Sequence, residues 1–89
     1  MTQELLAWDA HAATWQLVLN EQPIPYRRAQ VSCDLPVPVT ARVVWERDGV
    51  EEVDTVVWAW TRRSVLVEMH DDRRQVIGVW LPARDVRRR

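Results

Sequence analysis

Hydrophobic residues recur with two different periods along the chain, and the first of these periods is helical. Near the N-terminus the apolar positions are separated by alternating steps of three and four, which places them on one stripe: Leu5, Trp8, Ala12, Trp15 and Leu19. Asn20 and Pro23 are signals for the end of a helix. We therefore expect an N-terminal helical segment over residues 1–20. Residues 14–19 also alternate in the manner of a strand, so both states stay open for them.

The second period is strict alternation, which begins at Val39 and predicts β-strands joined by tight turns. On the first of these strands one face is wholly apolar: Val39, Ala41, Val43 and Trp45. The Asp48-Gly49 dipeptide is a strong signal for the turn that follows. A single tight turn is expected over residues 82–85. The pattern predicts strands over residues 39–47, 52–61, 64–70 and 75–81, and a short last strand from Val86.

Prolines separate the helical pattern from the strand pattern. Four of the five prolines lie between residues 21 and 38, where they remove amide hydrogens needed by a helix interior or a central strand. We therefore expect residues 21–38 to form a connector, in which residues 26–32 could add a short edge strand.

The second predicted strand is apolar on both faces, with Val57 and Ala59 on one and Trp58 and Trp60 on the other. Such a strand must be covered on both sides, and the N-terminal helix has the apolar stripe to supply the second cover. The expected fold class is therefore α+β. Residues 1–89 would form one domain, in which the helix packs on a small, mostly antiparallel barrel of four to five strands.

The end of the chain resembles the end of an SH3-type barrel. A glycine and apolar residues lead into a proline, followed by a small residue, one turn and a valine, in the order Gly78-Val79-Trp80-Leu81-Pro82-Ala83-Arg84-Asp85-Val86. With the strands before it, the resemblance covers about residues 38–89 and implies an SH3-like barrel over residues 39–89. The aromatic opening motif of peptide-binding SH3 domains is missing, so a proline-peptide site is not implied. Barrels of this kind serve many functions.

Composition indicates whether the chain folds and in which cellular location it is expected. Apolar residues make up 47% of the sequence and the formal net charge is −1, which fits a folded domain rather than a disordered one. Cys33 is the one cysteine, so no internal disulfide can form and a reducing, cytoplasmic location is expected. No apolar run approaches the roughly 20 residues that span a bilayer, and no membrane partner is expected.

Alternate turns of an antiparallel barrel lie at opposite ends, so the charges are expected to separate. One end should carry three arginines against six carboxylates: Arg47, Arg73 and Arg74 with Glu46, Asp48, Glu51, Glu52, Asp71 and Asp72. The other should carry six arginines against Asp85: Arg62, Arg63, Arg84, Arg87, Arg88 and Arg89. This basic end could meet phosphate groups or an acidic partner, or form only a solvated rim.

Six tryptophans accompany one tyrosine and no phenylalanine. Three of them lie on apolar faces and are interpreted as core residues: Trp8, Trp15 and Trp45. The other three either belong to the core or, if no helix covers them, form a binding surface with arginines at its rim. The first hypothesis is therefore a non-catalytic protein-interaction module that binds a protein partner, or a second copy of itself, through Trp58, Trp60, Trp80, Arg62 and Arg63.

Two other functions stay open. The first is an accessory nucleic-acid-binding protein, although a net charge of −1 is low for that class, and its site would be Arg62, Arg63, Arg84, Arg87, Arg88 and Arg89. The second is a subunit of an enzyme complex. Catalysis by this chain is not expected, because Ser64 and His70 would lie about 20 Å apart along a strand. No cofactor or metal is expected, since the spacing of His11, His70 and Cys33 matches no ligand motif.

Overall fold

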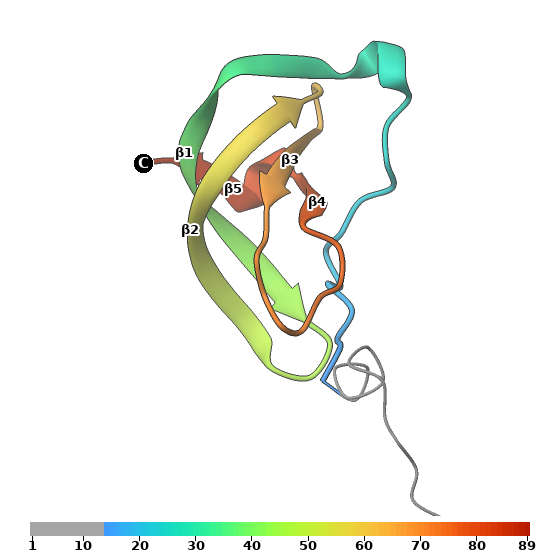
Figure 1. Ribbon diagram of the computed structural model, residues 1–89, viewed down its shortest axis with the longest axis vertical. Coiled ribbons are helices and arrows are strands. Elements are labelled where there is room, and N and C mark those ends of the chain that lie inside the picture. The colour runs from blue at the N-terminus through green and yellow to red at the C-terminus, as the bar shows by residue number, and fades with distance from the viewer. Residues whose placement is uncertain (1–13) are drawn as a thin grey trace, which may run out of the picture.

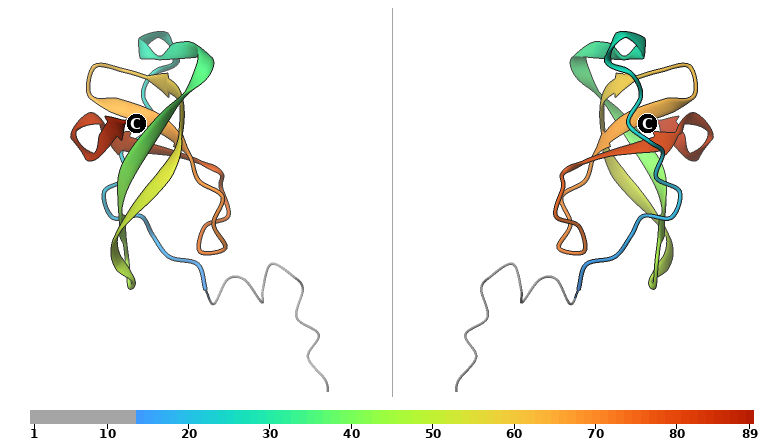
Figure 2. Two further views of the ribbon diagram at one scale, coloured as in Figure 1. Left: turned by 90° about the vertical axis from the view of Figure 1, so that its left-hand side faces the viewer. Right: turned by 90° about the vertical axis from the view of Figure 1, so that its right-hand side faces the viewer.

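The computed structural model of the chain describes residues 14–89. Five antiparallel strands form one open sheet in the order β4-β3-β2-β1-β5. Their bounds are Val31–Trp45 (β1), Gly49–Trp60 (β2), Ser64–Glu68 (β3), Gly78–Pro82 (β4) and Val86–Arg88 (β5). Single 3₁₀ turns precede β1 and β5, at Arg27–Ala29 (η1) and Ala83–Asp85 (η2). The long strands β1 and β2 bend around the three short ones and give the sheet the curvature of a small barrel (Figure 1 and Figure 2).

The core lies inside the curve of the sheet and follows the predicted alternation. The predicted inward face of β1 is confirmed, because all four of its residues are buried: Val39, Ala41, Val43 and Trp45. They form one cluster with side chains of the other strands, among them Val57, Val67, Val79 and Leu81. The predicted turn is also present, and Gly49 has the positive φ of 78° that glycine adopts without strain. The later strands and the turn over Ala83–Asp85 lie near their predicted places, although β4 begins at Gly78 rather than at residue 75.

The α+β fold class is wrong, because residues 14–89 contain no α-helix and are mostly β-structure. The part of the predicted helical segment over residues 1–13 lies outside the described residues. In residues 14–20 neither predicted pattern holds. The segment forms no helix and pairs with the sheet through an isolated bridge at Val18, which is buried, whereas Leu17 and Leu19 are exposed. Trp15 is only half-buried.

Backbone pairing with distant strands explains why this segment is extended. Val18 forms an isolated bridge with Trp45 at the end of β1, and the Leu19 amide donates to the Val44 carbonyl. Further on, the Gln22 amide donates to the carbonyl of Trp80 on β4. Residues 16–22 therefore connect the end of β1 with the edge strand β4, and we call this segment, which turns once at residues 19–20, the strap (Figure 1). A helix here would give up these sheet contacts.

Asn20, which the sequence marks as a helix stop, attaches this strap to β1. Its amide nitrogen donates to the Arg42 carbonyl and to the Asp85 carboxylate, and its oxygen accepts from the Val44 amide. The side chain thus stands in for a neighbouring strand at a point where β1 has none, which satisfies polar backbone groups that would otherwise lack partners.

The connector predicted over residues 21–38 ends earlier than expected, because β1 begins at Val31 and includes two of its prolines. Ser32 pairs with Ala59 and Val37 with Val57, so residues 33–36 of β1 lie opposite the single residue Trp58. This wide irregularity takes the prolines out of a regular hydrogen-bond ladder, which is how a strand accommodates them. The sheet therefore starts about eight residues before its predicted boundary.

A second irregularity, in β2, separates two tryptophans that the sequence places on one face. Val57 pairs with Val67 and Ala59 with Leu66, so Trp58 is an extra residue relative to β3. Since paired residues share a face, Trp60 returns to the inner face that Val57 occupies, whereas Trp58 points outward. The expectation that Trp58 and Trp60 share a face is therefore wrong. Both side chains are partly exposed, by 43% and 44%.

Candidate functional site

The twelve arginines of the chain fall into two groups that differ in their bonding. Six donate from their side chains to carboxylates or carbonyl groups: Arg42, Arg47, Arg73, Arg74, Arg87 and Arg89. The guanidinium groups of the other six form no ion pair or hydrogen bond with any residue in the described range 14–89: Arg27, Arg28, Arg62, Arg63, Arg84 and Arg88. Arg47, Arg73 and Arg74 of the first group belong to the β1–β2 turn and the β3–β4 loop, whereas Arg88 of the second group lies between two members of the first, Arg87 and Arg89.

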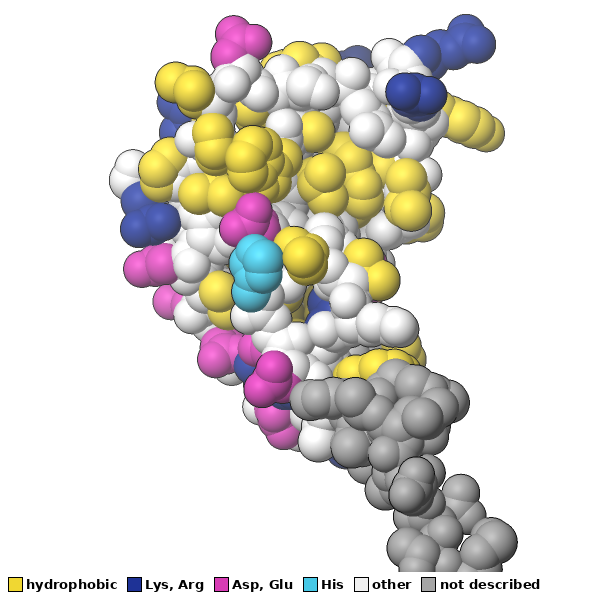
Figure 3. Space-filling view, viewed as in Figure 1, with side chains coloured by type: hydrophobic (Ala, Val, Ile, Leu, Met, Phe, Trp, Pro, Cys, Tyr) yellow, Lys and Arg dark blue, Asp and Glu magenta, His cyan; other side chains and the backbone are white. Residues whose placement is uncertain are grey.

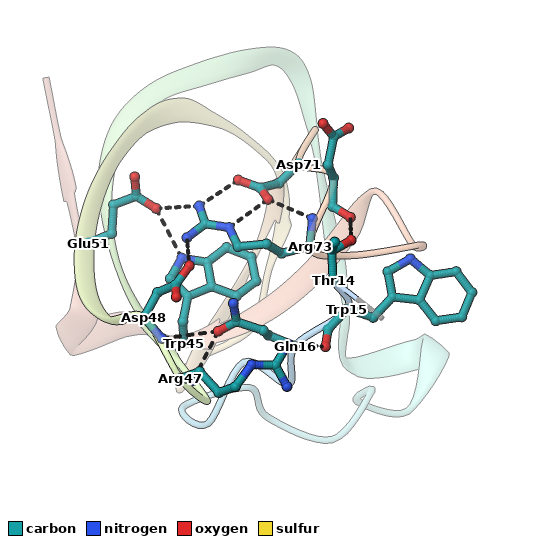
Figure 4. A network of polar contacts seen from close by, with 10 residues as sticks. Thr14, Trp15, Gln16, Trp45, Arg47, Asp48, Glu51, Asp71 and Arg73 are labelled. Atoms are coloured by element: carbon teal, nitrogen blue, oxygen red, sulfur yellow. Dashed lines mark hydrogen bonds and ion pairs between the residues drawn. The ribbon is translucent and has the colours of Figure 1, made fainter. Parts of the chain in front are cut away.

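The acidic pole, at the β1–β2 turn and the β3–β4 loop, is built around Arg73 (Figure 4). Its guanidinium donates twice to Asp71, at 2.7 and 2.8 Å, and also to Glu51 at 2.7 Å and Asp48 at 3.0 Å. The same group lies 4.0 Å above the Trp45 ring, whose indole N–H donates to Glu51. One cation thus joins three carboxylates and covers a core tryptophan.

The charges of the acidic pole shift one another toward the ionised state. Hydrogen bonds from the Arg73 guanidinium lower the pKa of Asp71. Hydrogen bonding by Gln16, followed by that of Arg73, lowers the pKa of Asp48. The pKa of Arg73 is raised in turn, chiefly by Asp71. Asp71 and Arg73 also line an open hollow of about 680 Å³, but their charges are already paired with one another, so we interpret the acidic pole as structural.

The second group of arginines defines the basic pole, which we name by its six members: Arg27, Arg28, Arg62, Arg63, Arg84 and Arg88. The β2–β3 turn supplies Arg62 and Arg63, and the Arg63 carbonyl accepts from the Ala83 amide of η2, next to Arg84. A groove of about 790 Å³ is lined by Ile24, Tyr26, Ala29, Arg62 and Arg63, and the two arginines of η1 directly precede Ala29 in the chain. Hydrophobic side chains gather over the upper half of the face in Figure 3, and basic ones project beyond them.

The Trp60 pocket lies on the inner face of the sheet, and Trp60 and Val65, which line it, are the direct chain neighbours of Thr61 and Ser64, which line the groove. It is a cavity of about 310 Å³ whose walls are formed by apolar residues and one thiol: Cys33, Val37, Val39, Val57, Val65 and Val86. Trp60, Ala83 and Arg88 complete the lining. Arg88 is paired with Val39 across β1 and β5, which places it on the pocket side, whereas its neighbour Arg87 faces the other way and binds Glu52 at 2.7 Å. The pocket therefore combines an apolar wall with one aromatic ring and one cation.

The structure brings together only some of the residues that the sequence nominates. Trp60, Arg62 and Arg63 lie at the basic pole with Arg84 and Arg88. Trp58 lies on the outer face and donates to Glu68 at 2.8 Å. Trp80 is 5% exposed and cannot contact a partner at the surface.

The terminal arginines also separate from one another. Arg87 is held by Glu52, and the Arg89 guanidinium donates to the carbonyls of Val39 and Thr55, so neither belongs to the basic pole. Acidic residues and backbone carbonyls of the sheet, which are distant in sequence, decide this division.

Sequence reasoning missed the contribution of residues 24–33, because it treated them as part of a connector. Tyr26 is 86% exposed, and it precedes the two arginines of η1. The sequence signal that could have indicated a binding surface here is the aromatic Tyr26, directly followed by Arg27 and Arg28. Cys33, for which the sequence predicts no site, lines the Trp60 pocket.

Within residues 14–89, no group of three His, Cys, Asp or Glu side chains is arranged to hold a metal ion. The same part of the chain has no helix that is long and apolar enough to cross a membrane. Comparison of the chain with protein-family models, with curated protein sequences and with solved structures gave no match.

Proposed function

We propose that this protein is a non-catalytic protein-interaction module whose contact surface is the basic pole with the Trp60 pocket. One observation carries the proposal: a partly exposed tryptophan lies between an apolar cavity and arginines that have no carboxylate partner among the described residues. Tryptophan and arginine are the residue types most enriched at binding hot spots, where a desolvated pocket supplies much of the affinity.

The apolar character of this end favours a protein ligand. Besides Trp60, four large hydrophobic side chains near the pole are exposed: Ile24, Tyr26, Val31 and Leu35. Exposed apolar groups that adjoin one another mark interaction sites, because water is displaced from them on binding. The candidate nucleophile offers no support for catalysis, since the Ser64 hydroxyl is paired with that of Thr61 and His70 is paired with Glu68.

Affinity capture from a lysate of the native host tests the proposal when it is run with and without nuclease. We expect the wild-type chain to retain a protein after nuclease treatment and the Trp60→Ala variant to lose it. Trp58→Ala is the matched control, because Trp58 is the same residue type with nearly the same exposure on the opposite face. Equal capture by the two variants would contradict the proposal.

Nucleic-acid binding is the second candidate, and the unpaired arginines favour it. Six guanidinium groups at one pole can contact phosphates, and exposed Tyr26 and Trp60 can stack on bases. Fluorescence anisotropy with labelled duplex and single-stranded DNA and RNA, at about 50 and 200 mM salt, separates the candidates. Binding that collapses as salt rises and is lost in Arg62→Gln/Arg63→Gln would move the assignment to nucleic acid.

We infer further that the sheet is an SH3-like barrel. The support is local: β4 leads through Pro82 into the single turn η2, and the valine-bearing strand β5 follows, in the order that the resemblance implies. A fold of this kind positions a site without specifying its ligand, so the functional proposal rests on the pole and not on the fold.

A further inference from the structure

We propose that the partner contributes an acidic segment with one apolar anchor residue, which enters the Trp60 pocket while neighbouring carboxylates pair with Arg88 and Arg63. This inference rests on the proposed function and names the chemistry of its ligand. It is carried by the combination of pocket lining and unpaired charge at one end of the sheet.

The size and lining of the pocket fit a side chain better than a free small molecule. Its volume of about 310 Å³ is at the low end of small-molecule sites, which span roughly 300–1,000 Å³. The apolar wall accepts an aliphatic or aromatic group, and the adjoining groove with Tyr26 extends the contact surface beyond the cavity. Specific protein interfaces need about 800 Å² on each side, which one buried side chain does not provide alone.

The charge of the ligand follows from the charge that surrounds the pocket. Arg88 lines the cavity itself, and Arg63 and Arg84 adjoin it through the contact between Ala83 and the β2–β3 turn. None of these guanidinium groups pairs with a carboxylate of residues 14–89. Arginine binds a carboxylate through two parallel hydrogen bonds, so an acidic residue beside the anchor is the complementary group.

Addition of a strand from the partner is the less favourable mode here. The half of β1 that β5 leaves uncovered contains the irregular residues 33–36 and Pro36, which lacks an amide donor. Bulges and prolines are the devices that keep a sheet edge from pairing with another chain. The contact is therefore made by side chains, and the anchor and the carboxylates carry its specificity.

The test is selection from a display library of random peptides against the full chain, followed by binding of the selected peptides as synthetic, labelled probes. We expect the selected sequences to share an apolar residue flanked by Asp or Glu. Trp60→Ala and Arg88→Gln should each weaken binding about tenfold or more, the equivalent of about 1.4 kcal/mol. The matched controls Trp58→Ala and Arg87→Gln should retain it, since both residues face away from the pocket.

Cys33 supplies a second readout without any substitution, because it is the one cysteine and it lines the pocket. A bound anchor residue should slow its reaction with a thiol reagent severalfold, whereas a peptide bound elsewhere should leave the rate unchanged. This measurement keeps the test valid even if Trp60→Ala disturbs the sheet.

Each result decides for or against the inference. The inference is overturned if the selected peptides lack acidic residues, or if no selected peptide depends on Trp60 and Arg88 for binding. It is also overturned if the chain binds oligonucleotides and no peptides. If host-protein capture still depends on Trp60 while the selected peptides are not acidic, only the ligand chemistry fails. If that capture is lost on nuclease treatment, the proposed function fails as well.

Discussion

The acidic pole and the basic pole use the same residue in opposite ways. At the acidic pole, Arg73 lies between three carboxylates and the Trp45 ring, and its side chain is only 22% exposed. At the basic pole, Arg63 and its neighbours have no described carboxylate within reach and extend into solvent. The difference teaches that a net charge near zero is compatible with two unlike regions. In one region the charges pair within the fold, and in the other the arginines are available to bind a ligand.

The tryptophans repeat this division. Trp45 is 1% exposed and serves as the platform for Arg73, while Trp60 is partly exposed beside an apolar cavity. A fully buried aromatic ring contributes most to folding, and a ring that is nearly half exposed beside a cavity contributes less. The same substitution made at each pole, followed by a measurement of stability, therefore tests whether the two poles differ in this way.

Replacement of a tryptophan at each pole should give the largest contrast. Trp45→Ala removes a fully buried ring and should lower the free energy of unfolding by about 3–5 kcal/mol. Trp60→Ala should lower it by about 1 kcal/mol or less. Urea unfolding followed by circular dichroism measures both, because fluorescence would itself change with the substitutions. Similar losses in the two variants would show that Trp60 is part of the core.

Arginine substitutions should give a smaller contrast of the same sign. Arg73→Ala leaves the carboxylates of Asp48, Glu51 and Asp71 close together without their cation, and should cost about 2 kcal/mol. We expect less than for a buried ion pair, because the carboxylates are partly exposed and solvent screens them. Arg63→Ala should change the free energy of unfolding by about 0.5 kcal/mol or less, since it removes no bond. Urea midpoints at one pH measure both, and a larger cost for Arg63→Ala would reverse the assignment of the two poles.

The sequence was sufficient for the strands and insufficient for the strap. On β1 the alternation is strict because one face is buried, so local pattern and tertiary packing agree from Val39 to Trp45. In residues 14–20 two local patterns compete, and pairing with β1, more than twenty residues away, overrides both. Val18 is the residue that is buried, although neither the helical stripe nor the predicted alternation included it.

The candidate site was predictable by residue type and only partly by place. Trp60, Arg62 and Arg63 could be named, because an apolar strand followed by two arginines indicates an exposed aromatic and basic end. Trp58 lies on the other face because β2 contains one extra residue relative to β3 at this point. No local pattern in the sequence predicts that extra residue. Likewise, the binding of Arg87 by Glu52 depends on which strands become neighbours, and that is a property of the whole fold.

Acid should affect the two poles differently. The pKa values of Asp71 and Asp48 are lowered in the folded state, so their contribution to stability is complete above the unfolded value of 3.8 and is lost as pH falls through the lowered values. We expect the urea midpoint of the wild type to fall from about pH 4 downward. Arg73→Gln should show a shallower fall, and Arg63→Gln should follow the wild type. Parallel curves for all three proteins would mean that Arg73 does not hold these carboxylates ionised.

The smallest expected effect is a gain in stability at the basic pole. Arg62 and Arg63 are adjacent, exposed and without a described carboxylate, so Arg62→Gln/Arg63→Gln relieves like-charge repulsion at no cost in bonds. The urea midpoint should rise slightly at low salt, by the equivalent of about 0.5 kcal/mol or less, and the gain should vanish near 1 M salt, where the screening length is about 3 Å. Arg87→Gln is the matched control, because it removes a cation that Glu52 already balances and should not raise the midpoint. A loss of stability in the double variant, persisting at high salt, would mean that these arginines are bound within the fold, and the basic pole would then be structural like its counterpart.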